Sequence, residues 1–189
     1  MQEIRGWSRK ELFVCVVFAC ATFAASFVLG SGITLALGPG TSGVATILIT
    51  TVIVVIGANI VGTIGYFTLV VTLFTVLAIP TNMFGPPGPH KVIIGLSTGL
   101  VYDLAWNLTA RKRFSLPFAA AVSTAASILL IFLFMVWFFP EHPKRETIAG
   151  LLKYLIPVYA VLGFIGGVLG DWIYKKSLAD LSIVKMLKQ

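Results

Sequence analysis

The residues best suited to chemistry in this chain lie where a proline-rich loop, PTNMFGPPGPH, runs into an apolar helical segment that starts at Lys91. Prolines fix φ and remove backbone donors, so this loop is stiff. His90 and Lys91 stand at the junction, and a helix N-terminus attracts anions even before a lysine adds its charge. Both residues are therefore candidate contacts to an anionic ligand. The alternative is an interfacial anchor whose charged head reaches water, and the sequence leaves the two open.

Asp103 is the one acid well inside an apolar segment. A carboxylate is expensive in lipid and normally faces protein or water. It can serve a substrate or a proton, or it can be a buried acid paired with Tyr102, Asn107 or a neighbouring helix. At 1.5 Å per residue, Asp103 lies about 18 Å along the helix from Lys91. It would therefore lie deeper in the membrane than a shallow ligand pocket beside Lys91 at the outer surface. We therefore favour a structural or conformational role for Asp103, with Asn107 as a second polar group inside the membrane.

Four further side chains can supply hydrogen bonds and stacking for a ring-shaped ligand. They are Asn82 in the proline loop, Trp137 at the end of the longest apolar run, and Tyr154 and Tyr159 in the last apolar run. The sequence predicts them as substrate contacts. For each, a place in the aromatic belt at the membrane interface or in helix packing stays open as the alternative.

No catalytic set or metal site can be assembled from these residues. His90 and His142 are the only histidines, both in loops, and neither has a second ligand at metal-binding spacing. There is no nucleophile–base spacing and no Walker motif for binding ATP. The sequence therefore predicts that the protein is not an enzyme, uses no cofactor or metal, and takes any energy it needs from elsewhere.

The composition indicates what must position these residues. Of the 189 residues, 58% are hydrophobic and only 11% are charged, whereas an ordinary soluble domain has about 25% charged residues. The apolar runs approach the roughly 20 residues needed to cross a bilayer. We therefore expect an all-α, polytopic membrane protein. The net charge of +7 is explained by membrane orientation and anionic lipid rather than by nucleic acid.

We expect a single membrane domain, 1–189, with six transmembrane helices. Their predicted spans are about 10–29, 44–58, 61–79, 91–109, 116–139 and 149–174. Ser8 and Glu11 have the spacing of a capping box that starts the first helix. The second and third helices are expected to meet at a tight turn at 57–59, the tripeptide Gly-Ala-Asn.

The segment Gly30–Gly43 is predicted to be a loop with an apolar centre, ITLAL. With glycine at both ends it can swing and then bury that centre over a ligand, as a lid does. We expect ligand to protect this loop from proteases.

Basic residues divide unevenly between the two sides of a six-span layout. With a cytoplasmic N-terminus, ten lie inside and four outside, as the positive-inside rule expects. The inner ten are Arg5, Arg9, Lys10, Arg111, Lys112, Arg113, Lys175, Lys176, Lys185 and Lys188, and the outer four are Lys91, Lys144, Arg145 and Lys153. Both termini are therefore predicted to be cytoplasmic, and the loops Gly30–Gly43 and Pro80–His90 to face outward.

Three stretches of the sequence resemble a known family of membrane proteins. They are the small-residue face Ala21-x-x-x-Ala25, the segment FGPPGPHKVIIGLSTGLVYDL and the glycine-rich ending GFIGGVLGDWIYKK. With the chain length and the six predicted spans, they make nearly the whole chain similar to the substrate-binding S components of energy-coupling factor (ECF) transporters, which take up vitamins and related micronutrients.

The resemblance implies that Ala21 and Ala25 dock onto a membrane coupling subunit driven by two ATPase subunits. It also implies that a small organic substrate binds near the outer surface, under the loop between the first two helices. Small-residue faces serve ordinary helix packing as well. That alternative stays open for Ala21 and Ala25, and we favour it for the glycines at 163, 166, 167 and 170. Nickel and cobalt members carry a histidine near residue two, where this chain reads MQE, so metal transport is not expected.

The sequence thus predicts a multi-pass protein of a prokaryotic plasma membrane that captures a small organic nutrient, a vitamin or precursor, with high affinity. Its partners would be that nutrient, membrane lipid, the coupling subunit and the two ATPases. The alternative is a self-sufficient secondary transporter coupled to protons through Asp103. An intramembrane enzyme lacks the residues it needs, and an assembly protein has only the small-residue faces in its favour.

Overall fold

The computed structural model describes residues 7–37, 42–83, 86–109, 114–138 and 145–188, and these residues form helices and no strand. The helices are α1 (Arg9–Leu37), α2 (Ser42–Val61), α3 (Tyr66–Leu77), α4 (His90–Leu108), α5 (Ser115–Phe138), α6 (Arg145–Ile173) and α7 (Ser182–Lys188), with a π-helical turn, η1 (Tyr174–Leu178), between α6 and α7. The all-α prediction is confirmed for this part of the chain. Arg5, residues 111–113 and Lys144, which were used for the predicted orientation, lie outside the described residues.

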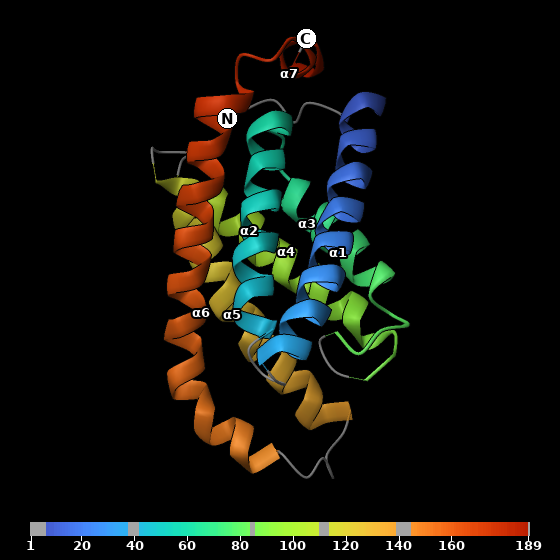
Figure 1. Ribbon diagram of the computed structural model, residues 1–189, viewed down its shortest axis with the longest axis vertical. Helices are drawn as coiled ribbons and strands as arrows, with labels where there is room; N and C mark the ends of the chain where they lie inside the picture. The colour runs from blue at the N-terminus through green and yellow to red at the C-terminus, as the bar shows by residue number, and fades with distance from the viewer. Residues whose placement is uncertain (1–6, 38–41, 84–85, 110–113, 139–144, 189) are drawn as a thin grey trace.

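The helices α1 to α6 form a closed ring of neighbours. The pairs with the most extensive contacts are α1–α2, α1–α3, α3–α4, α4–α5, α5–α6 and α6–α2, and Figure 1 shows their axes roughly aligned. The start of α1, the end of α6 and α7 lie together at the top of that view, which we call the terminal end. The end of α1 and the starts of α2 and α6 lie at the other end of the ring, which we call the loop end.

Three described helical segments are long and apolar enough to cross a membrane: Arg9–Gly32, Ser115–Phe138 and Ala149–Leu178. The apolar stretches of α2 and α3, Thr46–Val61 and Tyr66–Leu77, are shorter. These helices mark a membrane protein.

The predicted capping box at the start of α1 is present. The Ser8 amide donates to Glu11 Oε2 at 2.7 Å, and the Glu11 amide donates to Ser8 Oγ at 3.2 Å. Glu11 also accepts a hydrogen bond from the Thr63 hydroxyl at 3.0 Å. The cap therefore also ties the start of α1 to the turn between α2 and α3.

The predicted turn at 57–59 is wrong, because α2 continues to Val61 and the chain reverses between Gly62 and Gly65. Both of these glycines have positive φ, 68° and 91°, which glycine adopts without strain. Gly57 instead allows close approach, since a Cβ built there would lie 1.9 Å from Tyr66 Oη. The sequence could not separate a glycine needed for a turn from one needed for a contact.

The predicted loop Gly30–Gly43 is wrong over its first part, because α1 continues through ITLAL to Leu37. In a bilayer no water is present to satisfy free backbone groups, so the chain stays helical through glycines that would end a soluble helix. Residues 38–41 lie outside the described residues. The apolar centre of the segment is therefore part of a helix and not of the loop that the lid prediction needs.

The main buried cluster of the bundle lies at its terminal end. The main buried cluster includes Cys15 of α1, Val55 of α2, Tyr66 and Phe67 of α3, Trp106 of α4 and Ala120 of α5. Glycines of α6 complete it: a Cβ at Gly167 would lie 2.6 Å from Pro117 Cα, and one at Gly170 would lie 2.8 Å from the Val52 carbonyl oxygen. The expected packing role of these glycines is confirmed.

Packing is looser towards the loop end. No described residue of α5 from 124 to 138, and none of α6 from 146 to 162, is buried. Among the described helices, α5 and α6 are therefore loosely packed at the loop end, whereas Ala78 of the α3 end and Lys91 of α4 are buried there.

Candidate functional site

The carboxylate of Asp103 binds the N-terminus of α3. Its Oδ1 accepts the Gly65 amide at 3.1 Å, and its Oδ2 accepts the Thr68 amide at 2.8 Å and the Thr68 hydroxyl at 2.6 Å. The first amides of a helix have no partner within it and carry a partial positive charge. Because Gly65, the N-cap of α3, has no side chain for this task, Asp103 supplies the cap from α4.

Lys91 binds the opposite end of the same helix. Its ammonium donates to the Ala78 carbonyl at 3.0 Å and to the Thr81 carbonyl at 2.5 Å, and its side chain is fully buried. Ala78 is the C-cap of α3, where unpaired carbonyls carry partial negative charge. The cation therefore neutralises the end of α3 and holds the turn that follows it.

The spacing of the two charges matches the length of α3. Lys91 and Asp103 are 12 positions apart in α4, and α3 has 12 residues. The separation of the two charges along α4 and the length of α3 are therefore both about 18 Å at 1.5 Å per residue. Two glycines between the charges bring the helices together, since a Cβ at Gly99 would lie 2.5 Å from Thr68 Cα and one at Gly95 would lie 2.0 Å from Thr75 Oγ1. We call Lys91 and Asp103, with α3 between them, the α3 brace.

Aromatic stacking fixes the rotation of α3 within the brace. The rings of Phe67 and Tyr102 stack with centroids 3.6 Å apart and planes 8° apart, and Trp106 meets Phe67 edge-on at 5.5 Å. The sequence left Tyr102, Asn107 or a neighbouring helix open as the partner of Asp103. The structure shows that the partner is the neighbouring helix α3. Asn107 is exposed near the end of α4.

The other predicted site residues do not form one cluster. His90 lies beside Phe138 of α5, with ring centroids 6.1 Å apart, and Asn82 is exposed in the loop after α3. Trp137 is 82% exposed and Tyr154 is 61% exposed, which suits a membrane-interface position. The structure therefore brings α4 and α5 together near His90 but leaves Trp137 and Tyr154 on the outside.

Tyr159 differs from the other predicted aromatic contacts because it is half-buried among three helices. Its hydroxyl lies 3.2 Å from the position that a Cβ would take at Gly43 of α2. Its backbone carbonyl accepts the Thr124 hydroxyl of α5 at 2.8 Å. Tyr159 thus stands where α2, α5 and α6 meet, on the loosely packed side of the bundle.

Ala21 and Ala25 lie on either side of the middle of α1, where Ala21 is exposed and Ala25 is half-buried. On the same helix Val17 and Val28 are also exposed. The helix therefore presents an apolar surface around Ala21 that the rest of the described chain does not cover.

Sequence reasoning missed a set of buried hydroxyl groups. Within the described ranges, the Oγ1 atoms of Thr22 in α1, Thr72 in α3 and Thr98 in α4 are buried without a hydrogen-bond partner, as are the hydroxyls of Tyr66 and Tyr102 in the main buried cluster. An unpaired buried hydroxyl costs about 1–3 kcal/mol, so such groups are candidates for a ligand contact. No spacing in the sequence distinguishes these threonines from the others in apolar segments.

No group of three or more metal-ligating side chains was found among the described residues.

The fold has a relative among solved structures. The chain matches a structure described as "Crystal structure of an S-component of ECF transporter" with a TM-score of 0.55 and 20% identity, over 97% of this chain and 94% of that chain. No family model matches the chain, and no curated protein matches it by sequence. The structural match extends over essentially the whole of both chains, and at this identity it shows a common fold.

Proposed function

We propose that this protein is the substrate-binding subunit of an ECF-type transporter, which captures a small organic nutrient outside the cell. The observation that carries the proposal is the shared fold over 97% of the chain with an S component. The bundle suits the task because its helices pack tightly at one end and loosely at the other. In this role the protein binds the nutrient, while a membrane coupling subunit and two ATPases supply the movement and the energy.

The proposed membrane arrangement has six spans, with the terminal end in the cytoplasm of a prokaryotic cell. The ring of α1 to α6 supports it, since an even number of crossings returns the chain to the side where it began, and the start of α1 and α7 lie together (Figure 1). Lys175, Lys176 and Lys185 lie at that end, as the positive-inside rule expects.

The nutrient would enter at the loop end. His90 and Tyr159 lie towards this end on different sides of the ring, and the partnerless hydroxyls of Thr22, Thr72 and Thr98 lie near the middle of their helices. Each of these hydroxyls is a candidate hydrogen-bond partner for the nutrient. Lys91 supports the wall at this end through the turn after α3, and its two backbone partners leave one ammonium hydrogen for a ligand.

Two measurements on the intact protein test this function. Native mass spectrometry of the purified protein should reveal a co-purified small molecule, which should rebind the emptied protein with nanomolar affinity. Cells that express the chain should take up this molecule only when the ATPase module is also present. Tight binding with uptake that needs no ATPase would contradict the proposal in favour of a self-sufficient carrier.

The coupling surface is tested by Ala21→Trp. Because Ala21 is exposed, the tryptophan should leave substrate affinity unchanged in the isolated protein but abolish energised uptake by blocking the partner. Leu100→Trp, at a residue of α4 that is 53% exposed, is the matched control and should permit uptake. Equal loss of binding and uptake in the Ala21 variant would mean that this face packs within the bundle.

A further inference from the structure

A pocket of about 380 Å³ lies at the terminal end of the bundle, away from the candidate substrate site. It is formed between the start of α5 and the end of α6. Its lining residues are Phe114, Pro117, Val168, Asp171, Trp172, Lys175 and Lys176. The volume falls within the roughly 300–1,000 Å³ typical of ligand pockets, and nothing in substrate capture at the loop end uses it.

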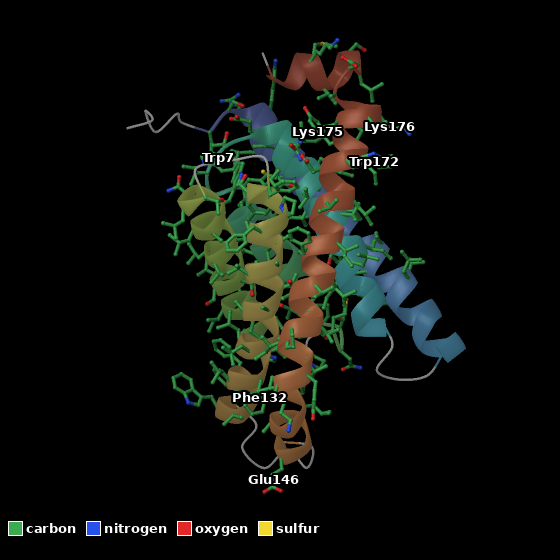
Figure 2. The ribbon with its side chains drawn as sticks, turned by 90° about the vertical axis from the view of Figure 1, so that its left-hand side faces the viewer. Trp7, Phe132, Glu146, Trp172, Lys175 and Lys176 are labelled. Atoms are coloured by element: carbon green, nitrogen blue, oxygen red, sulfur yellow. The ribbon has the colours of Figure 1, made fainter. Side chains whose placement is uncertain are left out.

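The two helices touch beside this pocket. Gly167 packs against Pro117, where a Cβ would meet Pro117 Cα at 2.6 Å. Beyond this contact the lining residues of α6 and η1 follow one another at helical spacings of three and four, so they form a single stripe along the helix. Figure 2 shows Trp172, Lys175 and Lys176 gathered on the last turns of this helix, just below α7.

The wall of the pocket is apolar and open. Phe114 is 61% exposed, Trp172 is 54% exposed and Val168 is 38% exposed. In a membrane protein such side chains face lipid chains, and tryptophan prefers the depth of the headgroups. The exposed wall therefore passes from the hydrocarbon layer into the headgroup layer.

The charge at the rim of the pocket is only partly balanced. Lys175 pairs with Asp171, with 2.5 Å between Nζ and Oδ2. The ammonium of Lys176 lies 4.7 Å from the centroid of the Trp172 ring, and no described acid forms an ion pair with it. One uncompensated cation thus stands above an apolar wall.

We propose that this pocket binds one anionic phospholipid. The headgroup phosphate lies against Lys176, with Lys175 and the Trp172 ring beside it, and an acyl chain follows Val168 and Phe114 towards the bilayer centre. A zwitterionic lipid fits less well, because its own cation competes with the lysines for the phosphate. Basic pockets between membrane helices on the cytoplasmic side bind such headgroups. The lipid would fix the end of α6 at the depth where η1 and α7 begin.

The test uses the full chain in nanodiscs of phosphatidylcholine that contain a minor share of phosphatidylglycerol. After release from the discs, native mass spectrometry should show one retained phosphatidylglycerol. Lys176→Gln should weaken this retention about fivefold, the effect of one lysine at a membrane surface, and Lys176→Arg should restore it. The matched control is Lys185→Gln, which removes a lysine at the same end that pairs with Asp180 outside the pocket and should have no effect.

Brominated phosphatidylglycerol gives a second readout, because bromine quenches a tryptophan that it touches. The fluorescence of Trp172 is the part of the signal that Trp172→Phe removes. Brominated phosphatidylglycerol should quench this part, and brominated phosphatidylcholine should quench it less.

Equal retention of both lipids, or an equal loss of retention in Lys176→Gln and Lys185→Gln, would overturn the proposal in favour of unspecific lipid adhesion. Thermal stabilisation by inorganic phosphate alone in phosphatidylcholine discs would instead make the pocket a site for free anions. If no lipid is retained and Lys176→Gln abolishes energised uptake, the pocket would instead be assigned to a protein partner.

Discussion

At the scale of single residues, the two charges of α4 have complementary roles. Lys91 and Asp103 both sit in a segment that the bilayer disfavours for charge, and each is paired with an end of α3 rather than with the other. The carboxylate meets the positive end of that helix and the ammonium meets the negative end. The α3 brace thus lets a short helix keep its terminal backbone groups satisfied inside the bundle.

Asp103→Asn should destabilise the protein by about 1–3 kcal/mol, because an amide loses the charge and places a donor against one of the amides that the carboxylate accepts. Thermal unfolding in detergent measures this loss, and Asp180→Asn, at a residue whose side chain is 98% exposed, is the control. A stable Asp103→Asn protein whose uptake no longer depends on the proton gradient would favour the secondary transporter.

Lys91→Met should also lower stability by about 1–3 kcal/mol, because it leaves the carbonyls of Ala78 and Thr81 without their donor. Its effect on ligand affinity separates two roles of the lysine. If the third ammonium hydrogen binds an anionic nutrient, calorimetry on the folded variant should show weaker binding of that nutrient. Unchanged affinity in a destabilised variant would restrict Lys91 to the brace.

Thr98→Val should leave stability unchanged or raise it, because the Thr98 hydroxyl is buried without a partner. Affinity for the nutrient should nevertheless fall, since valine keeps the shape and removes the hydroxyl. Thr124→Val is the contrasting variant: the Thr124 hydroxyl donates to the Tyr159 carbonyl, so its removal should lower stability. Full affinity in the Thr98 variant would remove this hydroxyl from the proposed site.

At the scale of elements, α6 has two different halves. Its second half uses glycine to approach α5 and α2 closely, whereas its first half has no buried residue among those described. One helix therefore contributes both to the rigid terminal end and to the open loop end, with Tyr159 near the boundary.

Gly167→Ala should destabilise the bundle by about 1–3 kcal/mol, as overpacking does, because the added Cβ would lie 2.6 Å from Pro117 Cα. Gly150→Ala on the same helix is the matched control, since its Cβ would meet nothing within 4 Å. That control should be neutral or slightly stabilising. Chemical or thermal unfolding of the two variants would disprove the packing argument if both behaved alike.

At the scale of the whole molecule, the two ends of the six-helix ring differ in how tightly their helices pack. The main buried cluster, the start of α1 and α7 lie at one end, and the loosely packed parts of α5 and α6 lie at the other. This difference between the ends fits the proposed capture of a nutrient at the loop end and the proposed docking of partners at the terminal end.

The proposed orientation predicts which positions a membrane-impermeant thiol reagent reaches. In a background with Cys15 and Cys20 replaced by alanine, cysteines at Ser42 and Glu141 should be labelled in intact cells. A cysteine at Lys112 should be labelled only after the cells are opened, because basic loops stay in the cytoplasm. Labelling of position 112 from outside would invalidate the six-span arrangement.

The sequence alone determined the broad class of this protein and the approximate places of its helices, because both follow from local composition. Long apolar runs predict membrane helices wherever they occur, and Ser8 with Glu11 caps a helix within four residues. Only the tertiary structure decided what the special residues do. The partners of Asp103 lie 35 and 38 residues away, and Gly57 and Gly62 look alike until a neighbouring helix is in place. Helical spacing tells which residues share a face, but the helix that the face meets depends on the packing of the whole ring.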